Sequence, residues 1–240
     1  RRVTPKVFMT AHDIMPFYPG TFTEFIDPKD LSCPDTFDYR VSAAMMFKRF
    51  RYRYNPLRNV MIRRYLKSVK RVIAVSAALQ GALSQNSILN TVVIRNGIDA
   101  AAWSVPPSEI EAFKRSFNCE NLDLVLFGGR LSGAKGGILI LETMREIIRR
   151  APSAKLLVVG KKDGYAVRMA EKAAALGIGN SVVFTGWLDM SMIKKAYGAS
   201  TVVAIPSVCF DSFPNGNLEA FAAGKPVVAT CFGGSRELVH

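Results

Sequence analysis

The sequence predicts a doubly wound α/β fold, in which helices cover both faces of a parallel sheet. Short, continuous apolar runs recur along the second half of the chain, which is typical of strands that are buried on both faces. Helix-length segments separate these runs, as expected of consecutive βαβ units. In addition, 49% of the 240 residues are hydrophobic and 21% are charged, so the chain can bury a substantial core.

The elements of the second half follow one another without long interruptions. Strands are expected at 122–128, 154–160, 181–185, 201–206 and 226–230, and helices near 135–150, 164–175, 190–198 and 217–223. In sheets of this kind, ligands bind outside the carboxyl ends of the strands. The loops that follow the strands are therefore where we expect the functional site.

The first part of the chain contains fewer regular elements. Strands are expected at 6–12, 71–76 and 91–95, and helices at 41–54, 59–70 and 77–84, with a proline- and glycine-rich loop before residue 38. The apolar residues of the helix at 59–70 are predicted to share one face: Met61, Ile62, Tyr65, Leu66 and Val69. Residues 98–120 are expected to be a connector with one helix near 108–116, which starts after Pro106.

The net charge of +13 is concentrated near the start of the chain. Residues 1–75 contain 15 lysines and arginines against 6 acids, whereas residues 121–240 contain 14 against 9. No acid lies between Asp38 and Asp99, and ten basic residues alternate with aromatic ones from Lys48 to Arg71. This pattern predicts a phosphate-bearing partner, which could be a nucleic acid, an anionic membrane or a small phosphorylated ligand.

The cysteines and the chain ends give further expectations. The four cysteines, at 33, 119, 209 and 231, form no CxxC pair, which favours reduced thiols in a cytoplasmic protein and gives no support to a metal site. No apolar run approaches the roughly 18–20 residues of a membrane-spanning helix. Because the chain begins with Arg1-Arg2 rather than Met, we expect it to be an internal piece of a longer protein.

The loop after the strand at 122–128 has the composition of an anion site. Its glycines let the backbone approach a ligand, Arg130 and Lys135 supply positive charge, and a helix N-terminus follows. It is not a Walker loop, because no Ser or Thr follows Lys135, and it is not a GxGxxG loop, because Arg130 occupies the place of the second glycine. A solvated turn with surface cations is the alternative interpretation.

The loop after the strand at 201–206 carries two acids that flank a helix start. Asp211 lies in the loop and Glu219 lies in the next helix, while Asn215 and Gly216 are placed to offer backbone amides to an anion. Carboxylates in the same cleft can accept hydrogen bonds from sugar hydroxyls. The alternative interpretation is a helix-capping acid and a surface glutamate.

Several motifs, taken in order, resemble family 4 glycosyltransferases of GT-B fold. The C-terminal motifs are GGRLSGAKG, LLVVG, VVFTGWLD, IPSVCFDSFPNGNLEAFAAGKPVVAT and GGSRELV, and the upstream ones are FMTAHD, VIAVSAAL and TVVIRNGID. The resemblance implies two Rossmann-like doubly wound domains. Residues 1–97 would be the last part of an incomplete N-terminal acceptor-side domain, 98–120 the connector, and 121–240 a truncated donor-binding domain.

The resemblance also implies roles for residues of the donor-binding domain. Arg130 and Lys135 match the basic pair that grips the diphosphate of a nucleotide sugar. Glu219 matches the second acid of the E-x7-E pattern, which holds the ribose. Asp211 replaces the first glutamate of that pattern and is one methylene shorter, at the position that contacts the hydroxyls of the donor sugar.

Further matches lie around these residues. Asn215 and Gly216 fall where backbone amides meet the donor phosphate, and Phe213 matches between Ser212 and Pro214, which replace the usual Pro and Gly. The remaining matches are in other loops: Gly186 and Trp187 in the loop that borders the nucleobase, and His12 as the histidine that reaches toward the transferred sugar.

The function implied is that of a retaining glycosyltransferase without a dedicated metal or cofactor. It would move a sugar from a nucleotide-diphosphate sugar to a glycan or lipid-linked acceptor, in cell-surface polysaccharide or glycolipid synthesis. The expected location is the cytoplasm, with contact to anionic membrane through 48–71. Alternatives are a non-transferring relative such as a nucleotide-sugar epimerase or a phosphorylase, a degenerate binding protein, and a basic nucleic-acid-binding module.

Overall fold

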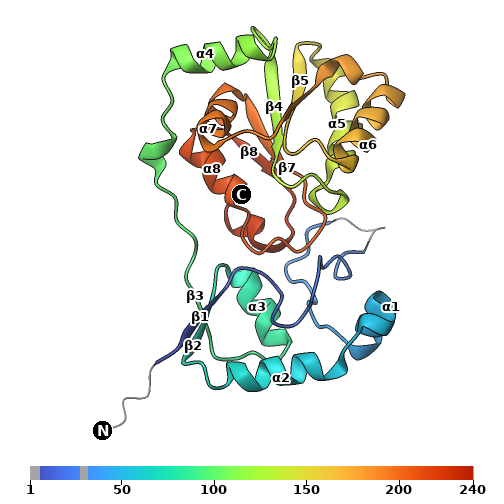
Figure 1. Ribbon diagram of the computed structural model, residues 1–240, viewed down its shortest axis with the longest axis vertical. Helices are drawn as coiled ribbons and strands as arrows, with labels where there is room; N and C mark the ends of the chain where they lie inside the picture. The colour runs from blue at the N-terminus through green and yellow to red at the C-terminus, as the bar shows by residue number, and fades with distance from the viewer. Residues whose placement is uncertain (1–5, 28–31, 240) are drawn as a thin grey trace.

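The computed structural model describes residues 6–27 and 32–239, which form two parallel sheets with associated helices (Figure 1). The larger sheet has five strands in the order β6-β5-β4-β7-β8, and the smaller has three in the order β1-β2-β3. In the larger sheet the chain starts at the central strand β4, builds one side, and then crosses back to build the other. This order creates a switch point between β4 and β7, where ligands bind in doubly wound folds.

The elements of the two sheets have the following bounds. The strands are β1 Phe8–Ala11, β2 Arg71–Ala74, β3 Thr91–Val93, β4 Asp123–Gly128, β5 Ala154–Val159, β6 Val182–Gly186, β7 Val202–Ile205 and β8 Val227–Ala229. The α-helices are α1 Ala43–Phe50, α2 Pro56–Leu66, α3 Ala77–Gln85, α4 Pro107–Ser116, α5 Gly137–Arg150, α6 Gly164–Ala175, α7 Met190–Ala199 and α8 Asn215–Ala222.

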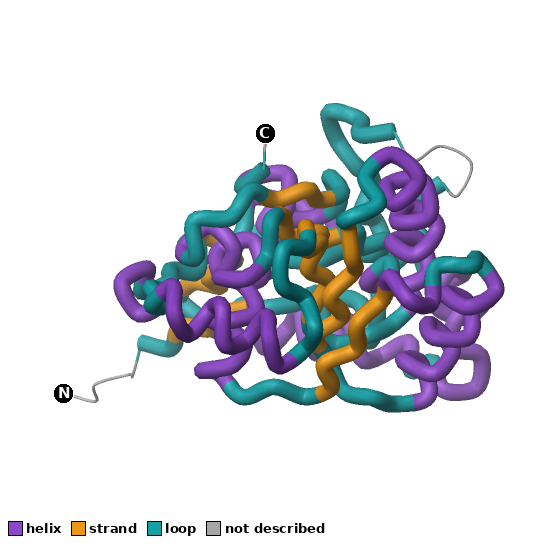
Figure 2. Tube along the Cα trace, turned by 90° about the horizontal axis from the view of Figure 1, so that it is seen from above, coloured by secondary structure: helices purple, strands orange, loops and turns teal. Residues whose placement is uncertain are grey.

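Helices cover both faces of the larger sheet, as Figure 2 shows by the strands lying between layers of helix. One core lies under α5 and α6, around Leu141, Met144 and Met169, while the other face packs against α4, α7 and α8. The second core includes Trp103 and Phe113. The helix that we expected in the connector therefore packs with the larger sheet.

The helix α2 differs from its sequence-based description. Leu66 is buried and Ile62 packs against the core, but Met61 and Tyr65 are exposed to solvent. The five apolar residues span a wider arc than the small three-stranded sheet can cover. The exposed face of α2 thus carries apolar side chains beside Arg64.

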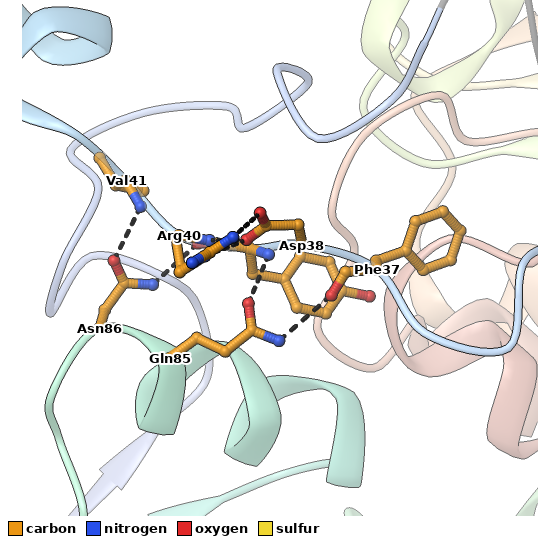
Figure 3. A network of polar contacts seen from close by, with 7 residues as sticks. Phe37, Asp38, Arg40, Val41, Gln85 and Asn86 are labelled. Carbon is orange, nitrogen blue, oxygen red and sulfur yellow. Dashed lines mark hydrogen bonds and ion pairs between the residues drawn. The ribbon is translucent and has the colours of Figure 1, made fainter.

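Residues 14–27 and 32–41 lie outside the two sheets, and contacts at the end of α3 fix residues 37–41. Figure 3 shows how Gln85, the last residue of α3, and Asn86, its C-cap, hold residues 37–41 through their side-chain amides. Gln85 accepts from the Tyr39 amide at 2.6 Å and donates to the Phe37 carbonyl, while Asn86 accepts from the Val41 amide at 3.0 Å. The Phe37 carbonyl and the Tyr39 and Val41 amides are therefore hydrogen-bonded although these residues belong to no sheet.

Aromatic side chains of residues 25–27 and 32–41 pack against the loops that follow β7 and β8. Phe25 and Tyr39 contact Phe210, and Phe37 lies 5.7 Å from Phe232 between ring centroids. The Phe22 carbonyl accepts from the Phe210 amide at 2.8 Å. The loop after β7 is thus held from the N-terminal side as well as by its own domain.

Candidate functional site

A cavity of about 890 Å³ opens at the carboxyl ends of β4, β5 and β7, at the switch point of the larger sheet. Its walls come from the loops that follow these strands and from α7 and α8. Parallel strands end on the same edge of the sheet, so loops that are distant in sequence converge here. The sequence-based expectation for the place of the site matches this geometry.

Gly136 fixes the loop after β4. It has φ of +80°, and a Cβ atom at this position would lie 2.0 Å from the Pro206 carbonyl oxygen, so only glycine fits. The neighbouring amide of Val208 donates to the Ala134 carbonyl at 2.8 Å. These contacts hold the β4 loop against the β7 loop, and they place Lys135 in the cavity wall.

The predicted cation and the predicted acid meet inside the cavity. The Lys135 ammonium donates to the Asp211 carboxylate, and the Ser207 hydroxyl lies 3.5 Å from the same Asp211 oxygen. Behind this pair, Gly233 and Gly234 approach so closely that a Cβ on either would collide with the carbonyls of Asp211 and Ser212. Residues 233–237, the motif GGSRE, thus pack against the backbone of the Asp211 loop and support it.

The N-terminus of α8 faces the cavity with unsatisfied amides. Pro214 is the N-cap and makes no side-chain bond to the first turn, and Asn215 and Gly216 line the cavity. The first amides of a helix have no intrahelical acceptor and carry positive partial charge. This end of α8 can therefore bind an anion.

Glu219, one turn further along α8, is oriented by a buried tyrosine. The Tyr197 hydroxyl donates to the Glu219 carboxylate at 2.7 Å, and Tyr197 is itself buried beside Trp103. Burial first, and the neighbouring Glu219 charge second, raise the pKa of Tyr197. The hydroxyl consequently keeps its proton and remains a donor to Glu219.

Positive and negative side chains are balanced in the lining of the cavity. The cations and acids that line it are Arg130, Lys135, Lys161, Asp163, Asp211 and Glu219. The carboxylate of Asp163 caps α6 by accepting from Tyr165 and Ala166 amides, and Asp211 pairs with Lys135. Arg130 is exposed and forms no ion pair within the described part of the chain.

Eight of the ten residues selected from the sequence line this cavity: Arg130, Lys135, Trp187, Asp211, Phe213, Asn215, Gly216 and Glu219. Gly186 directly precedes Trp187 and has φ of +83°. His12 follows β1, is exposed, and is not part of the lining.

Sequence reasoning missed other lining residues. Lys161 and Asp163 follow β5 and could have been selected by the same carboxyl-end rule. Tyr197 carries no comparable signal, because it lies within α7 and reaches Glu219 only through the fold.

The comparisons with known proteins agree on one class. Residues 123–240 match the family model described as Glycosyl transferases group 1. An uncharacterized glycosyltransferase of Methanocaldococcus jannaschii is 35% identical over 176 residues, which cover 70% of this chain and 44% of the relative. The lipopolysaccharide 1,2-N-acetylglucosaminetransferase of Salmonella typhimurium is 31% identical over 61% of this chain and 40% of its own length. The chain thus spans less than half the length of these curated relatives.

Solved structures show the same architecture. Anabaena HepE in complex with UDP and glucose superposes with a TM-score of 0.68 at 28% identity, over 75% of this chain and 51% of that protein. Sucrose-phosphate synthase from Thermosynechococcus elongatus has a TM-score of 0.70 at 20% identity, over 98% of this chain and 53% of its own. These neighbours are GT-B glycosyltransferases, so the predicted GT-B fold is confirmed.

Proposed function

Residues 123–240 belong to the glycosyl transferases group 1 family, and from this premise we propose that the chain binds a nucleotide-diphosphate sugar and transfers its sugar. The observation that carries the proposal is the cavity at the switch point, which combines three cations, the open N-terminus of α8 and the Glu219 carboxylate held by the buried Tyr197. One wall suits a diphosphate and the other suits a hydroxylated ribose. The complex of Anabaena HepE with UDP-glucose supports a donor of this class.

The diphosphate is assigned to Lys135, Arg130 and the amides of Asn215 and Gly216. In the transition state the nucleoside diphosphate departs while positive charge develops on the sugar ring. Fixed donors that stabilise the leaving group contribute about 3–4 kcal/mol each when strong. Lys135 is paired with Asp211, so the ammonium lies in the cavity wall before the diphosphate arrives, and the diphosphate competes with the carboxylate for it.

Glu219 and Asp211 are assigned to the hydroxyls of the donor. Glu219 accepts from Tyr197 through one oxygen, which leaves lone pairs for the ribose. Asp211 lies between Lys135 and Ser207 and would orient the transferred sugar together with His12. His12 is outside the described cavity lining, so this role requires the two sheets to approach when donor and acceptor are bound.

The stereochemical course and the acceptor complete the proposal. Transfer proceeds with retention, without a dedicated metal ion, and the departing phosphate oxygen accepts the proton of the acceptor hydroxyl. The acceptor is a glycan or a lipid-linked glycan in cell-surface polysaccharide or glycolipid synthesis, and the reaction takes place in the cytoplasm.

Contact with anionic membrane through residues 48–71 would bring the enzyme to a lipid-linked acceptor. None of the helices in the described part of the chain is long and apolar enough to cross a bilayer. The membrane contact that we propose is a peripheral one.

A calorimetric titration with UDP tests the donor assignment. Lys135→Ala should weaken UDP binding by about thirtyfold, because a hydrogen bond to a charged group contributes about 2 kcal/mol. Lys172→Ala is the matched control: Lys172 also pairs with a carboxylate, Glu142, and has nearly the same side-chain exposure, 36% against 35%. Equal affinity of the two variants would refute the assignment.

A further inference from the structure

A second cavity lies at the opposite edge of the three-stranded sheet from His12. It has a volume of about 490 Å³ and lies at the amino ends of β2 and β3, between the residues that follow α2 and those that follow α3. Its charged lining residues are all cations: Arg63, Lys67, Lys70 and Arg71. The family signature begins at residue 123 and does not include it.

The positive charge of this cavity is not neutralised by the protein. No Asp or Glu occurs between Asp38 and Asp99, and none of the four cations forms an ion pair with a carboxylate in the described residues. The C-termini of α2 and α3 contribute about half a negative charge each. Against four cations, the cavity therefore keeps a net charge of roughly +3, which favours an anion of high charge density.

The floor of the cavity is held rigid by an asparagine. The Asn90 side-chain amide donates to the carbonyls of Leu66 and Val69, at 3.0 and 2.9 Å, and the Ser68 hydroxyl donates to the Tyr65 carbonyl. These bonds satisfy the end of α2 and shape the turn that carries Lys67 and Lys70. Lys67 and Lys70 thus lie on a turn whose backbone is fixed by hydrogen bonds.

Exposed apolar side chains surround the cationic cavity. Leu89, in its lining, is 75% exposed, and Tyr65, at the end of α2, is 66% exposed. Phe8 lies exposed beneath the Lys70 ammonium, which is 5.9 Å from the ring centroid. The outer face of α2 carries further exposed apolar side chains, Leu57, Val60 and Met61, together with the exposed Arg64. Figure 1 places α2 at the end of the molecule farthest from α4 and β4.

A site for a free phosphorylated metabolite would gain nothing from this apolar rim. A membrane interface has both features, because anionic headgroups lie beside acyl chains. We propose that the cavity formed by Arg63, Lys67, Lys70 and Arg71 binds the phosphate headgroup of an anionic phospholipid, with Leu89 and the outer face of α2 inserted among the acyl chains. The inference rests on the proposed membrane contact of 48–71 and narrows it to one headgroup site.

Vesicle flotation of the whole chain tests the proposal. The vesicles are phosphatidylcholine alone, and an equimolar mixture of phosphatidylcholine and phosphatidylglycerol. The chain should float only with the mixture. Lys67→Ala/Lys70→Ala should weaken this binding by about thirtyfold, because each basic side chain at an anionic surface contributes about 1 kcal/mol. The charge-preserving variant Lys67→Arg/Lys70→Arg should bind like the original chain, which separates loss of charge from misfolding.

Arg145→Ala/Arg150→Ala is the matched control, because it removes the same charge from exposed positions on α5 of the donor domain. It should change vesicle binding by less than about twofold, because α5 packs on the larger sheet, away from the cationic cavity, and salt screens exposed charges beyond a Debye length of about 8 Å. Leu89→Ser should weaken vesicle binding by about tenfold and leave binding of inorganic phosphate unchanged, because only a lipid offers acyl chains.

Each contrary outcome has a separate meaning. Equal losses in the Lys67/Lys70 and the Arg145/Arg150 variants would overturn the headgroup site but leave general membrane contact standing. Flotation with neither vesicle would overturn the site and the membrane contact together, whereas equal flotation with both would overturn the site and the dependence on anionic lipid. Single-stranded RNA that binds more tightly than the mixed vesicles, with the same lysine dependence, would replace the lipid with a nucleic acid. UDP affinity, measured on the same variants, tests the donor proposal independently.

Discussion

The two cavities of the molecule hold cations in opposite ways. At the switch point of the larger sheet, Lys135 is paired with Asp211, and acids and bases are balanced in the lining. At the amino ends of β2 and β3, the charged lining residues are all basic. Pairing fixes a cation at one position before a ligand arrives, whereas unpaired cations create a broad positive field. The paired arrangement suits a small substrate that binds in one orientation, and the unpaired arrangement suits a charged surface.

The two cavities also differ in the structure beneath them. The donor-side cavity stands on a sheet with a core on each face, and its loops are locked by close glycine contacts. The basic cavity stands beside a three-stranded sheet whose hydrophobic core is completed by Phe210 and Phe213 of the donor-side domain. Rigidity is therefore concentrated where substrate geometry would matter.

The largest expected effect comes from disturbing the glycine contact that locks the loop after β4. Gly136→Ala should lower the free energy of unfolding by about 3–5 kcal/mol, because it adds left-handed strain to a collision with the Pro206 carbonyl. Gly224→Ala is the control, since Gly224 has φ of +68° but open space around its Cβ position. It should cost only about 1 kcal/mol. Urea unfolding measures both, and equal costs would show that the β4 loop is not locked against the β7 loop.

A smaller effect is expected from the tyrosine that orients Glu219. Tyr197→Phe should lower the free energy of unfolding by about 2 kcal/mol, because the partly buried Glu219 carboxylate loses its hydroxyl donor. The contribution is present below the unfolded tyrosine pKa of about 10 and is lost as the pH rises through the raised pKa of Tyr197.

Urea unfolding at neutral pH measures this change, and Tyr52→Phe, at a position 92% exposed, serves as the control. A Tyr197→Phe variant as stable as the Tyr52→Phe variant would mean that the contact with Glu219 contributes nothing.

Charge balance in the donor-side cavity can be altered directly. Asp211→Asn removes the carboxylate that competes with a diphosphate for Lys135, so UDP should bind more tightly by about fivefold, or about 1 kcal/mol. Sugar transfer should be lost, because the orienting acid is gone. Titration calorimetry and a transfer assay separate the two effects. Weaker UDP binding by this variant would show that Asp211 positions Lys135 rather than competing for it.

The smallest effect is expected where the two parts of the molecule are joined. Glu237 accepts from the Ala78 amide and pairs with Arg95 at 2.8 Å, across the interface between the sheets. Arg95 is 55% exposed, so Glu237→Gln should cost only about 0.5 kcal/mol in unfolding free energy. The cost should shrink in high salt, as seen by urea unfolding at two ionic strengths. A cost that does not depend on salt would show that it comes from losing the hydrogen bond of the Ala78 amide rather than the ion pair with Arg95.

The amino-acid sequence alone determined the order of the donor-side elements and the place of their site. Arg130, Lys135, Asp211 and Glu219 follow or flank the ends of apolar runs, and parallel strands must end on one edge. Their meeting in one cavity could therefore be predicted from local patterns. The charge pattern likewise located the basic segment, because the acid-free stretch is visible without any structure.

Only the tertiary structure decided which of these groups touch. The Lys135–Asp211 pair, the contact of Tyr197 with Glu219, and the packing of Phe210 into the other domain join residues far apart in sequence. Periodicity also predicted one apolar face for α2, but the small sheet covers only part of it and leaves Met61 and Tyr65 in solvent. A sequence pattern specifies which residues share a face, whereas what covers that face depends on the size and position of its neighbours.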